Sequence, residues 1–297
     1  MEIVFLGTSA MQPTKERNHP GIFLQYKGQG ILFDCGEGIQ RQLRIAGIKL
    51  TSITKIFITH WHGDHVLGLP GLIQSMGASE YTGTLQIYGP RGTRKNLETL
   101  NGLFAGKEVV DYVAHDVERG TIVDEDDYSV EAEEMKHGTP CLGYAFVEKD
   151  SRRILMDKVK KLKITEGPII GQLQHGEKVK VNGKVISPDD VSVIVPGRKV
   201  AYATDTRPCN GLLKLAKHAD VLLLESTYKS DMLDKAKEHM HMTAKEAAQV
   251  ANQAEVKKLY LVHFSQRYKN VQELEEDARD IFDNTEAAED FMRVVVK

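Results

Sequence analysis

Six consecutive residues near the start of the chain carry four side chains that commonly bind metal ions. They read His60-Trp61-His62-Gly63-Asp64-His65, in the pattern His-x-His-x-Asp-His. In an extended stretch His60 and His62 lie on the same side, because side chains alternate with a period of two. A turn at Gly63 would direct Asp64 and His65 toward a second position. Imidazole and carboxylate ligands together favour zinc, with iron or manganese as alternatives. The other interpretation is a histidine-rich polar loop without metal.

Further potential ligands follow apolar runs that are typical of buried strands. The run 56–58 precedes the cluster. Similar runs at 129–135, 200–204, 221–224 and 259–262 end at or just before these residues: His137, Asp205, Glu225 and His263. Loops at strand ends are where α/β proteins usually carry their sites. From residue 200 onward, strand and helix patterns alternate. Asp34, also at a strand end, either orients a ligand or caps its strand.

Local patterns outside these runs predict the elements that position the cluster. Residues 2–6, 22–26, 31–34 and 85–88 are expected to be strands. A helix is expected to begin near residues 34–38 and to end at Gly47, and another is expected over residues 66–75. Pro90 is expected to begin an amphipathic helix, since proline is tolerated in a first turn.

The composition is that of an ordinary globular protein, with 297 residues, 41% hydrophobic and 27% charged. This length allows one large domain or two. The formal net charge of −3 gives no overall attraction to nucleic acid. Three widely separated cysteines without a Cys-x-x-Cys pair indicate a reducing compartment and no disulfide framework. No apolar stretch has the length of a membrane span, and the first residues lack a basic signal-peptide region, so we expect a cytoplasmic protein.

One segment has a charge of the opposite sign. Residues 149–184 contain ten Lys or Arg and four Asp or Glu, a net charge of +6 in a chain of −3. The segment is polar, has little hydrophobic periodicity and contains the turn signal Gly167-Pro168. It is expected to be an insertion outside the core. A solvated loop with a chance excess of charge is the alternative interpretation.

Taken together, these motifs resemble the ribonuclease Z family, the tRNA 3′-processing endonucleases of the metallo-β-lactamase superfamily. The family's His-x-His-x-Asp-His motif is present in full, and its later single ligands match His137, Asp205 and His263. The loop Pro13-x-Lys15-x-Arg17-Asn18 matches the family's Pro-x-Lys-x-Arg-Asn motif. Gly167-Pro168 corresponds to the Gly-Pro of the family's substrate arm.

Two further family motifs are altered in this chain. The His-Ser-Thr motif is present as His241-Met242-Thr243, and the His-Glu-Ala-Thr motif as Leu224-Glu225-Ser226-Thr227. The resemblance covers nearly the whole chain. The metal motif is shared by many hydrolases of the superfamily, whereas the Pro-x-Lys-x-Arg-Asn loop and the arm narrow the resemblance to one family.

The resemblance implies a fold and an assembly. The fold would be an α/β (α+β) metallo-β-lactamase αββα sandwich, in which two mixed sheets face each other with helices outside. Residues 1–297 would form a single domain, with a basic substrate-binding arm inserted at about residues 149–195. The family is typically a homodimer in which the arm of one subunit holds a tRNA precursor for the other.

The resemblance also implies a set of site residues. Two Zn²⁺ ions per subunit would be held by one shared ligand, Asp205, and by two groups: His60, His62 and His137; Asp64, His65 and His263. The implied catalytic residues are Asp64, which orients the nucleophile and accepts its proton, His241, which protonates the leaving 3′-oxygen, and Glu225, which raises the pKa of His241. The implied substrate contacts are Lys15, Arg17, Asn18, Gly167 and Pro168.

The implied function is that of a zinc-dependent endoribonuclease. Such an enzyme removes the 3′ trailer of tRNA precursors and leaves a 3′-hydroxyl on the tRNA and a 5′-phosphate on the trailer. Two metal ions suit such a phosphodiester hydrolysis. One alternative is another hydrolase of this fold, a 3′-exoribonuclease or a small-ester or phosphodiester hydrolase. A non-catalytic RNA-binding module is a further alternative, although the complete ligand set argues against it.

Overall fold

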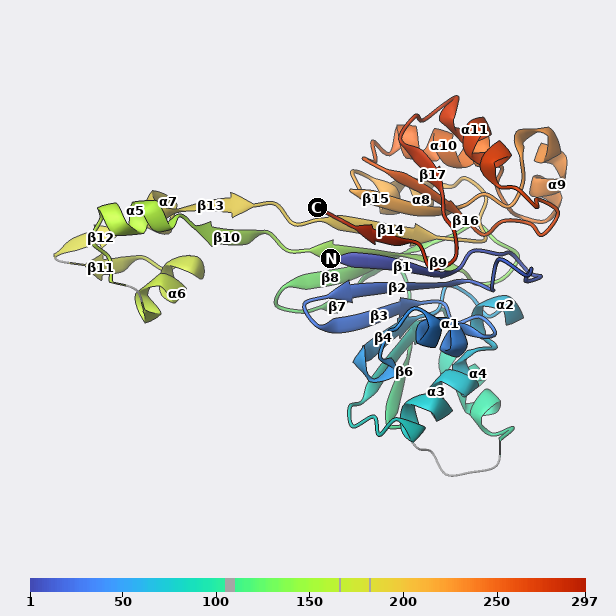
Figure 1. The fold of residues 1–297 in the computed structure, drawn as a ribbon, viewed down its shortest axis with the longest axis horizontal. Coiled ribbons are helices and arrows are strands. Elements are labelled where there is room, and N and C mark those ends of the chain that lie inside the picture. Colours follow the sequence, from blue (N-terminus) through green and yellow to red (C-terminus); the bar gives the residue numbers. More distant parts are fainter. Residues whose placement is uncertain (105–109, 166, 182) are drawn as a thin grey trace.

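Two seven-stranded sheets lie face to face in the computed structural model, which describes residues 1–104, 110–165, 167–181 and 183–297 (Figure 1). The first sheet has this strand order: β18 (Arg293–Val295), β1 (Glu2–Gly7), β2 (Gly21–Tyr26), β3 (Gln29–Phe33), β4 (Ile53–Phe57), β5 (Leu85–Gly89) and β6 (Tyr112–Asp116). Strands β18 to β3 pair antiparallel, and strands β3 to β6 pair parallel.

The second sheet has the same division into a parallel and an antiparallel half. Its strand order is β17 (Thr285–Ala287), β16 (Leu259–Val262), β15 (Val221–Glu225), β14 (Lys199–Ala203), β9 (Leu142–Glu148), β8 (Tyr128–Glu134) and β7 (Gly120–Asp124). Strands β17 to β14 pair parallel, and β14 to β7 pair antiparallel. Parallel strands bring their carboxyl ends to one edge of each sheet, which is where α/β proteins carry ligands.

Helices cover the outer face of each sheet (Figure 1). On the first sheet these are α1 (Ile39–Ile45), α3 (Leu69–Ala78) and α4 (Thr93–Asn101); on the second they are α8 (Asn210–Ala216), α10 (Ala244–Gln253) and α11 (Gln272–Arg279). Shorter helices lie in connections: α2 (Gly63–Val66) and α9 (Leu233–Glu238), with 3-10 turns at Leu50–Ser52 and Ser230–Met232. The expected αββα layers are confirmed. Within the described residues, no helix has both the length and the apolarity to cross a membrane.

Aromatic side chains fill the space between the sheets. Phe57 of the first sheet lies 5.3 Å from Tyr144 of the second, between ring centroids, and Phe33 lies 5.8 Å from Tyr202. All four are almost completely buried. Such rings contribute large buried areas and favourable edge and tilted contacts. The Tyr202 hydroxyl donates to Asp34 at 2.9 Å, so the core reaches a carboxylate at the functional edge.

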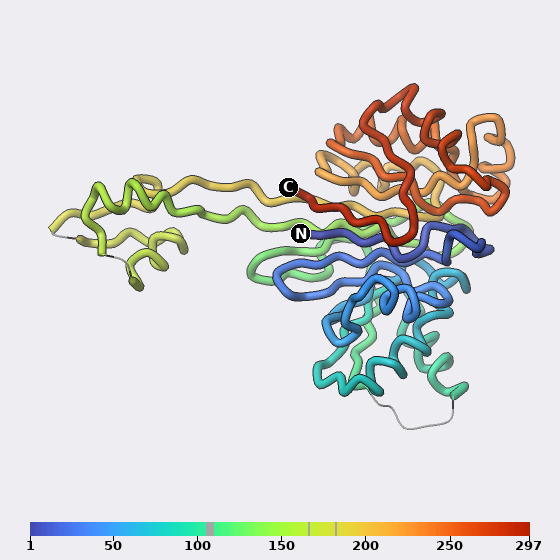
Figure 2. The backbone as a smooth tube through the Cα atoms, in the orientation of Figure 1, coloured from blue at the N-terminus to red at the C-terminus, as the bar shows by residue number. Residues whose placement is uncertain are grey.

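A long arm leaves the body beside the chain termini (Figures 1 and 2). Its stem is an antiparallel pair, β10 (Ser151–Ile154) with β13 (Ser192–Val195). Its tip contains α5 (Met156–Lys161), α6 (Pro168–Gln174), β11 (Val179–Val181), β12 (Lys184–Ile186) and α7 (Pro188–Val191). Val159, Leu173 and Val191 are at most 1% exposed in a small core of the tip. The low periodicity of this segment did not indicate this core, because its apolar residues are spread over short elements.

Two expected helices begin or break differently in the structure. The helix expected over residues 66–75 is divided into α2 and α3 at Gly68. A Cβ on Gly68 would lie 2.1 Å from the carbonyl oxygen of Gly36, so this residue allows a close backbone contact. The helix expected from Pro90 begins only at Thr93, because Gly92 has a left-handed φ of 101° that interrupts the turn.

Candidate metal centre

The seven predicted ligands come together at one edge of the sandwich. Four lie in the cluster 60–65, which forms the loop after β4 and the start of α2, and the other three follow the ends of different strands. His137 follows β8, Asp205 follows β14 and His263 directly follows β16. Their side chains form two neighbouring groups in which ligand atoms lie within 4.8 Å of one another: His60, His62, His137 and Asp205; Asp64, His65 and His263.

Three residues at this edge have backbone angles that non-glycine residues rarely adopt. The φ angles are 56° for Asp34, 51° for Asp205 and 60° for His263. The left-handed region costs roughly 1–3 kcal/mol for such a residue, and strained residues cluster at functional sites. At each of these positions the chain turns sharply after a strand and directs a polar side chain into the space between the sheets.

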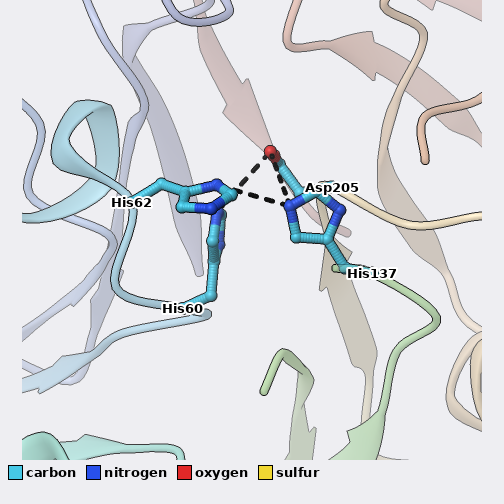
Figure 3. Close-up of side chains that lie close together, drawn as sticks. All are labelled: His60, His62, His137 and Asp205. Carbon is cyan, nitrogen blue, oxygen red and sulfur yellow. Dashed lines mark hydrogen bonds and ion pairs between the residues drawn. The ribbon is translucent and has the colours of Figure 1, made fainter. Parts of the chain in front are cut away.

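Asp205 lies between the two groups. Its Oδ2 is 3.5 Å from Nε2 of His60 and 3.8 Å from Nε2 of His137. Its Oδ1 is 3.3 Å from Nε2 of His65 and 3.0 Å from Nε2 of His263. Each carboxylate oxygen therefore faces a different group, as a ligand shared by two ions must. Figure 3 shows His60, His62 and His137 converging with Asp205.

Asp64 completes the second group and also touches the loop that precedes β2. Its Oδ2 lies 3.4 Å from Nε2 of His65 and 3.7 Å from Nε2 of His263. The same oxygen accepts a 2.9 Å hydrogen bond from the backbone N–H of Met11. The loop that contains Met11 is therefore fastened to a ligand of the site.

The ring nitrogens of the histidines fit metal binding. Nε2 of His60, His65 and His263 is buried without a hydrogen-bond partner, although carboxylate oxygens lie 3.0–3.5 Å away. Buried polar atoms are normally paired, so three such nitrogens directed at a shared space indicate ligands of a cation. The mixed imidazole and carboxylate donors suit zinc.

The other ring nitrogen, Nδ1, of both His60 and His263 contacts a threonine hydroxyl. Nδ1 of His60 lies 3.1 Å from the hydroxyl of Thr59, and Nδ1 of His263 lies 3.1 Å from the hydroxyl of Thr227. With Nδ1 as the donor, Nε2 keeps its lone pair for the metal, and such outer contacts fix the ring orientation. No role was predicted for either threonine from the sequence: Thr59 directly precedes the metal motif, and Thr227 ends the altered motif Leu224-Glu225-Ser226-Thr227.

The buried side chain of Asp34 contacts both the ligand His65 and the residue before His60. Its Oδ2 lies 2.8 Å from Nδ1 of His65 and accepts from the Tyr202 hydroxyl, while its Oδ1 accepts from the backbone N–H of Thr59 at 2.8 Å. The Thr59 hydroxyl also donates to this carboxylate. Of the two roles that the sequence left open for Asp34, the contacts favour orienting a ligand.

Electrostatics hold the two central carboxylates ionised. Burial alone would raise the pKa of Asp205, but the facing rings of His263, His65 and His60 outweigh it and hold that pKa well below its usual range. Burial likewise opposes ionisation of Asp64, and His65 and His263 hold its pKa low. Anionic carboxylates are the form that a metal ion requires.

His241 lies beside this centre with a carboxylate behind it. Its ring nitrogen Nδ1 is 3.2 Å from Oε2 of the fully buried Glu225, and a ligand atom of His241 lies within 4.8 Å of Asp205 and His263. Burial alone would lower the pKa of His241, but Glu225 raises it to about 9. Glu225 therefore favours the protonated form of the ring and occupies Nδ1.

A second ion pair holds the segment around His241, and sequence reasoning missed it. Arg207 and Glu246 form a bidentate pair, and Nη1 of Arg207 also donates to the carbonyl oxygen of His241. Glu246 accepts from the backbone N–H of Thr243 at 3.0 Å and completes a capping box at the start of α10. The pattern Thr243-x-x-Glu246 was a visible signal for the cap, but nothing local indicated its distant partner Arg207.

Two of the three motif residues in the loop 13–18 contact other parts of the protein. Arg17 is buried and donates to the carbonyl oxygen of Tyr268 at 2.5 Å. Asn18 donates its side-chain amide to Glu37 and its backbone N–H to Asp290. Burial raises the pKa of Asp290 to about 6. Both residues thus anchor the loop, whereas Lys15 is exposed and free to contact a ligand.

Gly167 and Pro168, the two other predicted substrate contacts, lie at the start of α6 in the tip of the arm, away from the metal centre (Figure 1). Gly167 has a φ of 148°, which only glycine adopts readily. The structure therefore divides the predicted site residues between a compact centre at the edge of the sandwich and a separate arm.

Comparison with known proteins agrees with this architecture. A family model described as "Beta-lactamase superfamily domain" matches residues 170–264, and one described as "Anti-Pycsar protein Apyc1" matches residues 1–141. Ribonuclease Z of Methanothermobacter thermautotrophicus is 45% identical over 100% of this chain and 97% of its own length. Ribonuclease Z of Archaeoglobus fulgidus is 42% identical, with coverages of 99% and 97%. The crystal structure of the short form of human tRNase Z is 30% identical, covers both chains completely and has a TM-score of 0.75.

The contacts of Asp34 generate a prediction about metal affinity. Asp34→Asn should weaken metal binding roughly 10- to 100-fold, because an amide cannot accept from His65 and Thr59 as the carboxylate does. Tyr202→Phe is the matched control, since it removes one donor and keeps the carboxylate, and its loss should be smaller. Chelator competition would measure both affinities, with thermal unfolding as a check of folding. Unchanged affinity in Asp34→Asn would contradict the orienting role.

Proposed function

This chain belongs to the ribonuclease Z family, and on that premise we propose that it uses two Zn²⁺ ions per subunit to cut the 3′ trailer from tRNA precursors. It is an endoribonuclease, a hydrolase of the metallo-β-lactamase fold. The products would be a tRNA with a 3′-hydroxyl and a trailer with a 5′-phosphate. The observation that carries the proposal is the central Asp205, whose two oxygens face two separate groups of metal ligands.

The division of the ligands follows the two groups. His60, His62 and His137 would hold one ion, Asp64, His65 and His263 the other, and Asp205 both. When bound, two such ions polarise a phosphodiester and make a water molecule acidic enough to serve as the nucleophile near neutral pH. This chemistry needs no covalent enzyme intermediate, so the remaining residues have only to position groups and to move protons.

Asp64 and His241 would handle those protons. Asp64 is the residue proposed to orient the attacking water and to accept its proton, with its Oδ2 held by the Met11 N–H. His241 would donate a proton to the leaving 3′-oxygen. Glu225 raises the pKa of His241, which supports this role because a general acid must hold its proton before the reaction. Glu225 would stabilise the charged ring and keep its second nitrogen directed at the site.

The arm is proposed to hold the body of the tRNA. Four lysines on and just after α5 are exposed on its surface: Lys158, Lys160, Lys161 and Lys163. The arm leaves the sandwich at the end opposite α2 and the metal-binding loop, so its tip would contact parts of the substrate distant from the cleaved bond (Figure 1). In a homodimer, which we also propose, the arm of one subunit would serve the centre of its partner. Of the loop residues, Lys15 would contact the substrate, while Arg17 and Asn18 would hold the loop in place.

We further propose that the protein is located in the cytoplasm, together with its tRNA precursor substrates. The three cysteines are free thiols, two of them buried, which suits a reducing compartment.

Mapping the cut on an end-labelled tRNA precursor tests the function most simply. A single internal cut at the 3′ end of the tRNA should appear, with a 3′-hydroxyl on the tRNA and a 5′-phosphate on an intact trailer. A ladder of mononucleotides would indicate a 3′-exoribonuclease instead. No cleavage by zinc-loaded protein would contradict the proposal.

The acid role of His241 predicts a dependence on the leaving group. His241→Ala should lower kcat on the precursor by on the order of 10²–10⁴. It should have far less effect on a substrate with a nitrophenolate leaving group, which departs without a proton. His239→Ala is the matched control, since His239 is exposed two residues away. Equal losses on both substrates would point to a structural role.

The arm generates a prediction about salt dependence. Replacing residues 155–191 by an Asn-Gly turn keeps the stem paired, because Ile154 lies opposite Ser192, and removes the small core of the tip as a whole. If three to five lysines contact phosphates, the slope of log K against log salt should flatten by roughly 2–4. Cleavage of a small phosphodiester should persist, because the ligands lie outside the arm.

A second variant distinguishes the effect of removing the arm from the effect of removing only its lysine charges. Changing Lys158, Lys160, Lys161 and Lys163 together to Gln keeps the arm and should reproduce most of the weakened tRNA binding. Unchanged affinity and slope in both variants would remove the arm from tRNA recognition.

A further inference from the structure

We propose that Asp290 is a positioning residue that holds the loop 8–18 against the metal centre. This inference rests on the proposed function and adds to it a residue that acts through a loop rather than on the substrate directly. Asp290 lies between β17 and β18, near the end of the chain, and its side chain is partly buried. It belongs to none of the sequence motifs of the site.

The carboxylate of Asp290 joins the two ends of the loop. Its Oδ1 accepts from the hydroxyl of Thr8 at 2.8 Å, and its Oδ2 accepts from the backbone N–H of Asn18 at 2.7 Å. Thr8 directly follows β1, and Asn18 lies just before β2. The two ends also contact each other, since the backbone N–H of Ser9 donates to the carbonyl oxygen of Asn18 at 2.9 Å. Asp290 therefore closes the base of the loop.

The same carboxylate is attached to the body of the protein. Its Oδ2 also accepts from Nε2 of Gln42, a buried residue of α1, at 3.1 Å. Nε2 of Gln42 donates at 2.7 Å to the carbonyl oxygen of Leu6 in β1 as well. The backbone after Asp290 is paired with β1, because the N–H of Phe5 donates to the carbonyl oxygen of Met292 at 3.1 Å. Asp290 thus connects the loop to a helix and a strand whose positions are fixed.

The loop that Asp290 closes reaches the metal-binding segments through its backbone. The N–H of Met11 donates to Oδ2 of Asp64 at 2.9 Å, and the N–H of Ala10 donates at 2.9 Å to the carbonyl oxygen of Phe264, the residue after His263. Met11 has a left-handed φ of 37°, a conformation that costs roughly 1 kcal/mol or more and persists only where the surroundings impose it. Release of the base of the loop would therefore allow Met11 to move away from Asp64.

The loop also carries Lys15, its proposed substrate contact. The backbone N–H of Thr14 donates to the carbonyl oxygen of Arg17 at 2.8 Å, and the hydroxyl of Thr14 accepts from the backbone N–H of Arg17 at 2.9 Å. Lys15 is exposed within this closed turn, and Asn18 directly follows the turn. The anchor at Asn18 therefore determines where the ammonium group of Lys15 can reach.

Charge strengthens this anchor. Burial raises the pKa of Asp290 to about 6, and the groups that oppose this shift by favouring the ionised form are Asn18, Thr8 and Arg17. All three belong to the loop 8–18. Hydrogen bonds to an ionised acceptor are roughly twice as strong as those between neutral groups. A neutral amide at this position would keep an acceptor oxygen and lose the attraction of the charge.

Three variants test the anchor by steady-state cleavage of a tRNA precursor. Asp290→Ala should lower kcat/KM roughly 10- to 100-fold, the loss expected when hydrogen bonds to a charged group are removed. Asp290→Asn should lose less, because its amide can still accept from Asn18 and Gln42. Glu289→Ala is the matched control, since it removes the same charge from the exposed neighbouring residue and should keep the wild-type value.

Hydrogen exchange of the zinc-loaded proteins distinguishes loss of the loop position from general loss of structure. In Asp290→Ala, the amides of Ser9 and Met11 should exchange faster than in the wild type, while the amides of β14 in the other sheet keep their protection. Faster exchange in β14 as well would show that Asp290 supports the whole fold and would overturn the specific role. If Asp290→Ala does not fold, Thr8→Val removes only the donor to Oδ1 and should show the same pattern at smaller size.

A double-mutant cycle with Lys15→Ala tests whether Asp290 acts through the loop. In the wild type, Lys15→Ala should reduce the slope of log K against log salt by about 1, as loss of one phosphate contact does. In the Asp290→Ala background it should have no further effect, because Lys15 is no longer held in place. Additive effects in the double variant, or wild-type kcat/KM and exchange in Asp290→Ala, would overturn the positioning role. Failure of the wild type to cut the precursor would instead contradict the proposed function.

Discussion

Asp205 places one carboxylate oxygen toward each of two groups of histidines, and the remainder of the centre depends on that division. The site is buried, so unpaired ring nitrogens and ionised carboxylates would be costly there without a cation. Three Nε2 atoms without hydrogen-bond partners are the clearest sign of that cost. A pair of metal ions would bind all three nitrogens. The arrangement is therefore better explained as a metal-binding site than as a contribution to the stability of the fold.

Sharp turns at the ends of strands bring the two groups of ligands together around Asp205. Left-handed residues at Asp34, Asp205 and His263 direct side chains from different strands into one space. Outside that space, Thr59 and Thr227 hold the far nitrogens of two ligand rings. Each threonine hydroxyl also donates to a buried carboxylate, Thr59 to Asp34 and Thr227 to Glu225. The same type of relay thus connects the metal ligands both to the core and to the carboxylate behind His241.

The sequence predicted those features of the protein that depend on residues close together in the chain. The spacing of the cluster 60–65 and the apolar runs before the later ligands follow from alternation along strands, whereas the two large sheets were implied by the family resemblance. The burial of Arg17 could not be predicted, because its partner Tyr268 is 251 residues away in the chain. Arg207 was missed for the same reason, since it acts through Glu246 on a distant helix. The break at Gly68 depends on a backbone contact with Gly36 that no local propensity reveals.

The central claim is that this single carboxylate is shared by two ions. A crystal structure of the zinc-loaded protein, with anomalous scattering recorded at the zinc absorption edge, tests it most directly. Two anomalous peaks should appear in each subunit, one against Oδ2 of Asp205 within the group of His60, His62 and His137, and one against Oδ1 within the group of Asp64, His65 and His263. A single peak, or a second peak that does not contact Asp205, would contradict the account.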